Sequence, residues 1–119
     1  MAKGVELTWS GGEHEFKLNI DLLRALQERC DAGPQHIFNR LGTGEWMVDD
    51  ITSTIRLSLE GGGLEKEEAR KLVKKHVEDR PLVLSVLTAR LALAHALFGD
   101  ENEEEGTDQS GEVKAVVAD

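Results

Sequence analysis

The residues of this chain that could do chemistry are four histidines, one cysteine and a pair of adjacent acids. The histidines are His14, His36, His76 and His95. None of them has the spacing to a cysteine or an acid that would place metal ligands on one face of a helix. We therefore expect no metal site, and we interpret His76 and His95 as partly buried helix residues.

Two further patterns have structural explanations. Asp49 and Asp50 could form an acid–base pair, but the dipole of a helix favours acids in its first turn. Gly61-Gly62-Gly63 could be a phosphate loop, but no Gly-Lys-Ser/Thr follows, and a predicted helix rather than a strand precedes it. A helix C-cap, which needs a left-handed residue, explains these glycines. Because nucleophile elbows, dinucleotide fingerprints and metalloprotease helices do not occur either, the sequence predicts a protein that is not an enzyme and needs no cofactor.

Length and charge restrict the class of protein further. A chain of 119 residues, 39% of them hydrophobic, can bury one modest core, which indicates a single domain. The net charge is -9, and residues 100–119 contribute eight acids and one lysine, or 1 − 8 = −7. No basic stripe that could neutralise phosphates is present, so we expect neither nucleic acid nor an acidic membrane as a partner. We predict one domain over residues 1–99 and, because residues 100–119 lack aromatics and are rich in Glu, Gly and Asp, a disordered acidic tail.

The N-terminal segment predicts a β-hairpin. Val5, Leu7 and Trp9 alternate with polar residues, as do Phe16, Leu18 and Ile20, and Gly11-Gly12 between them can form a two-residue turn. That turn would place Leu7 opposite Phe16, Val5 opposite Leu18 and Glu6 opposite Lys17. The apolar face of such a hairpin must pack on helices or on another copy, because an isolated hairpin is only marginally stable.

The rest of the domain predicts four to five helices. Asn19 can cap a helix that ends at Gly33-Pro34, and a short helix follows through residues 37–41. Apolar periodicity marks further helices over residues 48–59 and 69–77, and Arg80-Pro81 separates the second of these from a last helix over residues 82–98. The expected fold is α+β but mostly α, a hairpin packed on a small helix bundle. We expect Trp9 and Trp46 to support this fold rather than to bind a ligand.

The last helix also has to be considered as a membrane span. Residues 82–98 are apolar nearly all round, but seventeen residues are few for a span, and a mid-helix Arg90 costs roughly 2.5 to 3.5 kcal/mol on insertion. We expect a soluble helix. The lone Cys30 and the absence of a signal-peptide core at the N-terminus predict a cytoplasmic protein.

Several short motifs, in their order, resemble one known family. They are Gly44-Glu-Trp-Met-Val-Asp-Asp-Ile51, Ile55-Arg-Leu-Ser-Leu-Glu-Gly-Gly-Gly63, Glu67-Glu-Ala-Arg-Lys-Leu-Val73, Arg80-Pro-Leu82 and Ala96-Leu-Phe-Gly99. With the preceding hairpin they look like the gene transfer agent family of phage tail proteins, and the resemblance spans residues 4–99. Met47 departs from the expected Ser or Thr helix cap, and Leu64-Glu65-Lys66 departs from a capping Ser/Thr and Pro. Members are usually described as tail assembly chaperones and sometimes as tail tube proteins.

The resemblance implies a non-enzymatic tail assembly chaperone, in the cytoplasm of a bacterial host, that binds the tail tape measure protein. Homo-oligomers are possible. The alternatives are a structural tail tube subunit, which usually needs an extended β-sandwich, and an acidic regulatory binding protein that uses its tail against a basic partner. A chaperone needs an apolar surface for its client and needs solubility while that surface is open, and the last helix and the acidic tail could supply these. The alternative is that residues 82–98 form the central helix of a small bundle and are covered on all sides.

The last helix has two candidate stripes. Leu84, Leu87, Leu91 and His95 follow helical spacing, and we assign them to the core. Val83, Val86, Arg90 and Leu97 lie on the other stripe, which Arg90 marks as the wetter one. We therefore assign Val83, Val86, Arg90 and Leu97 to partner binding.

Overall fold

The structure is a computed structural model that describes residues 4–99. Its elements, in chain order, are β1 (Val5–Trp9), β2 (Gly12–Phe16), α1 (Ile20–Cys30), α2 (Pro34–Thr43), α3 (Val48–Gly61), α4 (Lys66–Val73), the π-helical turn η1 (Lys74–Glu78), the 3-10 turn η2 (Leu82–Ser85) and α5 (Val86–Phe98). The predicted mostly helical fold with an N-terminal hairpin is confirmed. The predicted disordered tail, residues 100–119, lies outside the described residues.

The two strands pair in antiparallel fashion, but the predicted register is wrong by two residues. Val5 rather than Leu7 lies opposite Phe16, and Glu6 faces Glu15 instead of Lys17. The two-residue loop is Ser10-Gly11, since Gly12 already pairs with Trp9. A shift of two residues keeps every side chain on its predicted face, so the apolar face survives.

The ring of Trp9 packs over the loop and joins the hairpin to the helices. A Cβ atom on Gly11 would lie 2.4 Å from the ring, so the loop needs a glycine there. Trp9 Nε1 donates a hydrogen bond of 3.0 Å to His14 Nδ1, and the ring makes edge contacts with Phe16 and His76. Ser10 Oγ donates to the His76 carbonyl at 3.3 Å. The expectations that Trp9 supports the fold and that His76 is a partly buried helix residue are confirmed.

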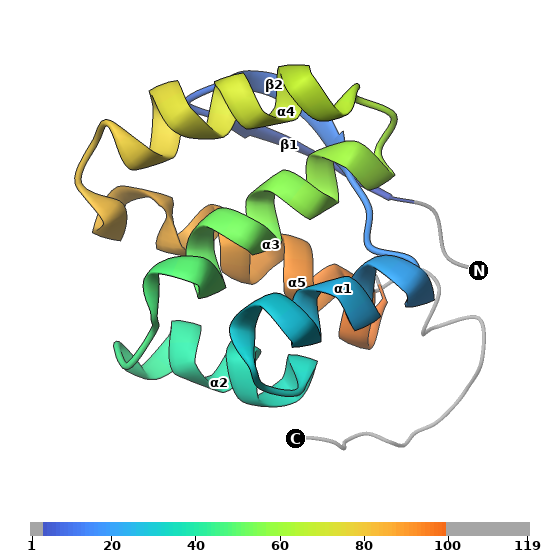
Figure 1. The fold of residues 1–119 in the computed structure, drawn as a ribbon, viewed down its shortest axis with the longest axis vertical. Coiled ribbons are helices and arrows are strands. Elements are labelled where there is room, and N and C mark those ends of the chain that lie inside the picture. The colour runs from blue at the N-terminus through green and yellow to red at the C-terminus, as the bar shows by residue number, and fades with distance from the viewer. Residues whose placement is uncertain (1–3, 100–119) are drawn as a thin grey trace.

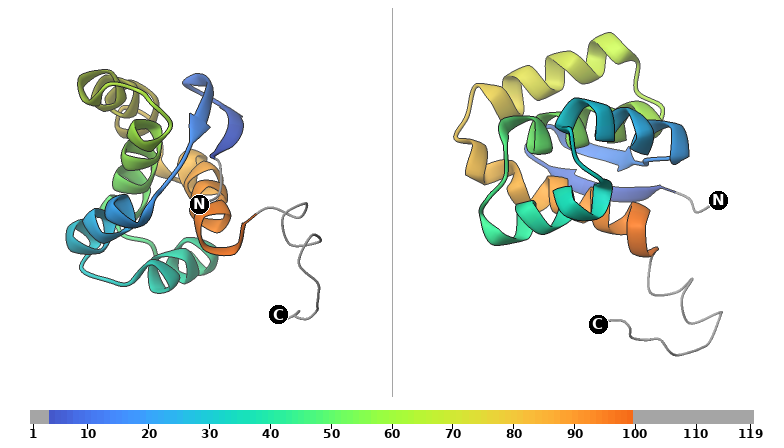
Figure 2. Two further views of the ribbon diagram at one scale, coloured as in Figure 1. Left: turned by 90° about the vertical axis from the view of Figure 1, so that its right-hand side faces the viewer. Right: turned by 60° about the horizontal axis from the view of Figure 1, so that its bottom comes forward.

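The helix α3 is the centre of the molecule and contacts α1, α2, α4, α5 and β2. Figures 1 and 2 show the hairpin and α4 at one end of the molecule and α1 and α2 at the other, with α3 between them. The largest core side chains on α3 are Ile51, Ile55 and Leu59, which are fully buried. Asp50 accepts a hydrogen bond of 2.9 Å from the Met47 backbone N–H, and this capping explains how the helix begins without a Ser or Thr.

The end of α3 approaches β2 so closely that side chains are excluded. A Cβ on Gly61 would lie 1.9 Å from the Lys17 carbonyl oxygen, and one on Gly62 would lie 1.9 Å from the Glu15 carbonyl oxygen. Lys17 N–H donates to the Ser58 carbonyl at 3.0 Å in the same place. Gly63 has φ 112°, the left-handed conformation expected of the C-cap. The glycine run therefore ends the helix, as predicted, and also lets α3 cover the outer edge of β2.

The predicted break at Arg80-Pro81 is confirmed, but the last helix begins differently than expected. Asp79 accepts from Lys74 Nζ at 2.6 Å rather than capping the next helix. Pro81 precedes the 3-10 turn η2, and α5 starts only at Val86. α5 packs on α2 and α3. Trp46 is half-buried against the core, as expected of a residue that supports the fold.

A candidate partner-binding surface on the last helix

The most exposed large apolar side chains of the described chain lie mainly on η2 and α5. The exposed fractions are 64% for Val83, 59% for Leu84, 65% for Leu87, 45% for Leu91 and 46% for Phe98. Steps of four and seven residues place Leu87, Leu91 and Phe98 along one side of α5, and Leu84 lies on the preceding turn η2, three residues before Leu87. We call these four residues, with Val83 beside them, the α5 stripe.

The opposite face of α5 is packed into the core. Ser85, Ala89, Ala92 and Leu93 are buried there. Alanines at the contact let a helix lie close to its neighbours, because the interaxial distance depends on the side chains between them. The helix α5 therefore has two apolar faces: one is packed within the domain, and the other is exposed.

This arrangement contradicts the predicted core stripe. Leu84, Leu87 and Leu91, which we assigned to the core, are exposed. His95, the fourth residue of that stripe, is half-buried. The predicted orientation is wrong because a helix with apolar residues on every side has no polar face to mark its orientation. The signal that could have identified the packed face is the spacing of Ser85, Ala89 and Ala92.

The four residues predicted to bind a partner are divided by the structure. Val83 is exposed and borders the α5 stripe, whereas Val86 and Leu97 are half-buried against the core. Arg90 is half-buried as well, so it does not mark the wetter side. A role of these residues in binding stays a prediction, which the geometry favours most for Val83.

Arg90 contacts α2 rather than water. Its guanidinium carbon lies 4.2 Å from the centroid of the Phe38 ring, a cation–π contact, and Phe38 packs edge-on against Phe98 at 5.3 Å. A Cβ on Gly42 would lie 2.9 Å from Arg90 Nε, so this glycine makes room for the guanidinium. The Phe38 ring therefore contacts both the guanidinium of Arg90 and the ring of Phe98, the last residue of the α5 stripe.

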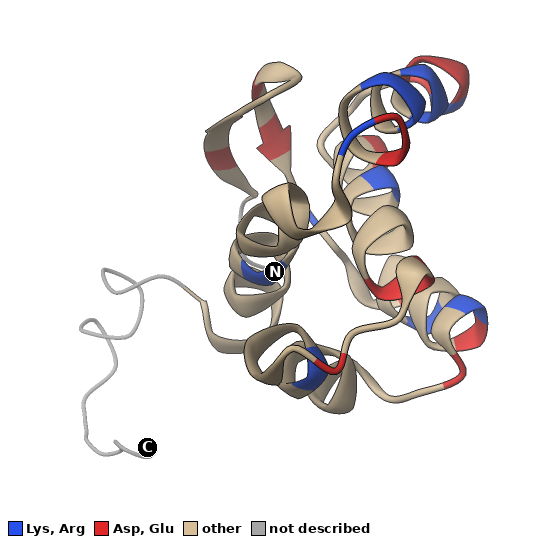
Figure 3. Cartoon of the chain, turned by 90° about the vertical axis from the view of Figure 1, so that its left-hand side faces the viewer, with Lys and Arg blue, Asp and Glu red and all other residues tan. Residues whose placement is uncertain are grey.

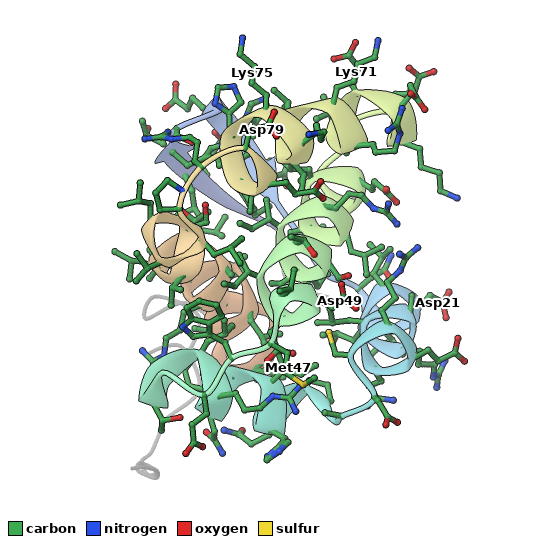
Figure 4. All side chains as sticks on the ribbon, turned by 60° about the vertical axis from the view of Figure 1, so that its left-hand side comes forward. Asp21, Met47, Asp49, Lys71, Lys75 and Asp79 are labelled. Carbon is green, nitrogen blue, oxygen red and sulfur yellow. The ribbon has the colours of Figure 1, made fainter. Side chains whose placement is uncertain are left out.

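Charge is distributed very unequally over the surface. In Figure 3 the blue and red segments gather on α4 and α1, whereas α5 is almost entirely tan. η2 and α5 contain no acid and no lysine, and Arg90 is their one arginine. In Figure 4, Lys71 and Lys75 lie on the outer side of α4 and η1, where Lys74 and Asp79 also form an ion pair. The α5 stripe is thus an uncharged surface on a charged domain.

A polar hollow of about 170 Å³ lies between α1, α3, α4 and η1. Its lining residues are Arg29, Asp49, Thr52, Ser53, Arg56, Arg70, Val73 and Glu78. Arg56 pairs with Glu60 at 3.6 Å, and Arg70 pairs with Glu67. Because both signs of charge line the hollow, and Arg56 and Arg70 already have acidic partners, its charge does not favour one class of ligand. Within residues 4–99 no group of three His, Cys, Asp or Glu could hold a metal ion.

The buried polar cluster near Cys30 has a structural role. Asp50 is fully buried and accepts from Arg40 Nε at 2.9 Å and from Arg40 Nη2 at 2.7 Å. The pKa of Arg40 is raised by its hydrogen bond with Asp50. Burial raises the pKa of the Cys30 thiol from 9.0 to about 12, and the negative charge of Asp50 adds to the shift. A thiol that stays protonated is a poor nucleophile, so this cluster joins α1, α2 and α3 without offering a reactive group.

A second exposed apolar group lies away from α5. Ile20 at the start of α1 and Met47 and Val48 at the start of α3 are each more than half exposed. Met47 is labelled in Figure 4, beside α2. These residues begin two different helices and form no helical stripe, so they provide a natural comparison for the α5 stripe.

Comparisons with known proteins agree with this helical domain and give it a family. No helix in residues 4–99 has the length and apolar character that crossing a membrane requires. Neither the curated proteins nor the solved structures yield a match. The model of the family described as "Phage tail tube protein, GTA-gp10" matches residues 3–99, well over half of the chain. The chain therefore belongs to this family of phage and gene transfer agent tail proteins.

Proposed function

We propose that this protein is a non-enzymatic tail assembly chaperone that binds apolar helical segments of the tail tape measure protein before the tube forms around them. The observation that carries the proposal is the α5 stripe. Leu87, Leu91 and Phe98 at helical spacing on α5, with Leu84 on η2, stay exposed on a domain of a tail protein family, although α5 buries its other face.

The physical properties of the stripe suit a helical client. Single exposed apolar side chains are normal on a protein surface, whereas large contiguous apolar patches are rare on monomeric proteins and mark interaction sites. Side chains at steps of three and four residues form ridges that fit the grooves of a second helix. Burial of a fully exposed leucine contributes roughly 1.5 to 3 kcal/mol, and the stripe leucines, which are 45% to 65% exposed, would each contribute about half of that before the cost of association. Several such residues would therefore give reversible binding, which a chaperone needs in order to release its client.

A structural tail tube subunit is the second candidate, and the description of the family favours it. A subunit that joins its neighbours by strand pairing needs open strand edges. The described chain has one two-stranded sheet, and the end of α3 lies against the Glu15 and Lys17 carbonyl groups on the β2 side, so this small sheet has little open edge to offer. Electron microscopy of the concentrated protein separates the two candidates, because a tube subunit should form rings or tubes and a chaperone should not.

Co-expression with the tape measure protein tests the proposal. We expect this protein to keep the tape measure protein in the soluble fraction and to co-purify with it. The variant Leu87→Gln/Leu91→Gln should remain folded and lose both effects. The matched control is Ile20→Gln, which removes an equally exposed apolar side chain elsewhere and should retain both effects. Equal activity of the double variant and the wild type would refute the proposal.

A further inference from the structure

We infer that a second copy of this chain covers the α5 stripe when no client is bound, in a weak dimer that pairs two α5 helices in antiparallel fashion around a two-fold axis. The inference concerns the regulation of the surface on which the proposed function rests, because a client would have to displace the second copy. The dimer itself can be measured without a client, so the two proposals are tested separately.

The order of side chains along the open face of α5 is the first observation. Leu87, Leu91, Ala94 and Phe98 follow one another at steps of four, three and four residues, which is the a/d spacing of helices that pair side by side. Ala94 is half-buried between the larger side chains that precede and follow it on this face. The open face is therefore a row of large side chains with one small residue in it.

This row is complementary to itself when two copies run antiparallel. A two-fold axis between positions 92 and 93 places Leu91 opposite the partner's Ala94, and Leu87 opposite the partner's Phe98. The large Leu91 then fills the space over the small alanine, and facing positions that alternate large and small side chains interdigitate well. A parallel pair would place Ala94 opposite the partner's Ala94 and would leave a gap between two layers of large side chains, which loses packing contacts.

The rest of the domain allows two α5 helices to approach. In the left view of Figure 2, α1, α3 and α4 lie to one side of α5, and the opposite side of α5 is at the surface. The row at positions 87, 91, 94 and 98 contains no charged residue, and Arg90 lies over the Phe38 ring. Like charges therefore do not meet at the contact, although each copy carries a net charge of -9.

The area of the stripe predicts that the dimer is weak. Its five side chains are 45% to 65% exposed, roughly 100 Å² each, so two copies would bury at most roughly 1,000 Å² in total. Stable complexes bury about 1,200 to 2,000 Å², and smaller interfaces belong to transient contacts. Such a dimer would shield the leucines and would still dissociate when a client binds the same surface.

Sedimentation of the full-length protein without a client tests the dimer. The protein is measured from about 1 μM to about 300 μM, which brackets a micromolar affinity, in about 0.15 M salt, where a Debye length of about 8 Å limits repulsion between the copies. We expect the wild type and the control Ile20→Gln to change from monomer to dimer over this range, and Leu87→Gln/Leu91→Gln to stay monomeric. Circular dichroism checks that the double variant is folded. A wild type that stays monomeric, or a double variant that dimerises equally well, would overturn the inference.

Disulfide formation between copies tests the antiparallel arrangement. The variants Leu87→Cys and Phe98→Cys are each combined with Cys30→Ala, so that only the introduced thiol can react. In the antiparallel pair these two positions face each other, whereas the two copies of position 87 lie eleven residues, or about 16 Å, apart along the helices. Because a disulfide needs Cα atoms within about 7 Å, the mixed variants should crosslink about tenfold faster than either variant alone. Equal rates for the mixture and the single variants would overturn the antiparallel dimer.

The two proposals can fail separately. If the protein alone is monomeric but keeps the tape measure protein soluble on co-expression, the inference alone fails. If the dimer forms but the tape measure protein is not bound, the proposed function fails and the dimer remains as the occupant of the stripe. If both hold, the disulfide between positions 87 and 98 should not form in the co-purified complex. Its formation there at the rate seen in the free protein would overturn the regulatory part of the inference.

Discussion

Single residues decide how closely the elements of this domain approach one another. Gly61 and Gly62 let the end of α3 touch the carbonyl groups of β2, and Gly11 lies under the Trp9 ring. The sequence predicted these glycines only as turn and cap residues. Their packing role could not be predicted, because it depends on which distant segment lies against them.

The first prediction concerns Gly62. Gly62→Ala would place a methyl group 1.9 Å from the Glu15 carbonyl oxygen, and a backbone atom cannot move aside as a flexible side chain can. We expect a loss of about 3 kcal/mol or more in the free energy of unfolding, measured by urea denaturation.

Gly33→Ser is the control for this variant. Gly33 is the N-cap of α2 and has no atom within 4 Å of an added Cβ, so a serine there should leave the stability unchanged or raise it slightly. If Gly62→Ala is as stable as Gly33→Ser, the close approach of α3 and β2 is wrong.

The second prediction concerns the pH dependence that Cys30 contributes. The folded chain raises the pKa of this thiol from 9.0 to about 12, so the unfolded chain releases the proton at a lower pH than the folded chain. The stability contribution is therefore fully present below about pH 9 and is lost as the pH rises toward about 12.

We expect the free energy of unfolding of the wild type to fall faster between pH 9 and 11 than that of Cys30→Ala, whose side chain cannot titrate. Comparing the two proteins removes the contribution of the lysines, which titrate in the same range. Parallel curves would mean that the Cys30 thiol titrates alike in the folded and unfolded chains.

At the scale of elements, the pattern of the sequence predicted most helices and both strands but not how α5 is oriented. Helices with a polar face, such as α1 and α4, show their buried side by periodicity. α5 lacks that contrast, since its apolar residues occur on every side. The contacts with α2 and α3 determine which face of α5 is buried. The small residues Ser85, Ala89 and Ala92 lie on that buried face, because they allow close packing of the helices. The hairpin register was also missed, because Gly12 pairs with Trp9 and the loop is Ser10-Gly11, with Gly11 against the Trp9 ring, whereas the prediction placed both glycines in the turn.

The third prediction tests the two faces of α5. Leu93→Ala removes a fully buried side chain and should cost about 2 to 5 kcal/mol in the free energy of unfolding. Leu87→Ala and Leu91→Ala change exposed positions of the same helix and should each stay within about 0.5 kcal/mol of the wild type. Thermal and urea denaturation of the three variants provide the comparison. Equal losses at positions 87, 91 and 93 would show that the helix is covered on both faces.

At the scale of the whole molecule, the candidate site could be predicted in part. The resemblance in the sequence led to the tail protein family, which the family match over residues 3–99 confirms. The last helix was correctly selected as the element with an apolar surface to spare, but the face was assigned wrongly, so Val83 is the one predicted partner residue that is exposed.

The central claim is that the tape measure protein binds on the α5 stripe, and site-specific photo-crosslinking tests it most directly. A benzophenone amino acid is placed at position 87, in the middle of the stripe, or at position 20, an exposed apolar site on α1. On irradiation of the co-expressed proteins, we predict a crosslink to the tape measure protein from position 87 and none from position 20. A crosslink from position 20 alone, or from position 87 only to a second copy of this chain, would contradict the claim.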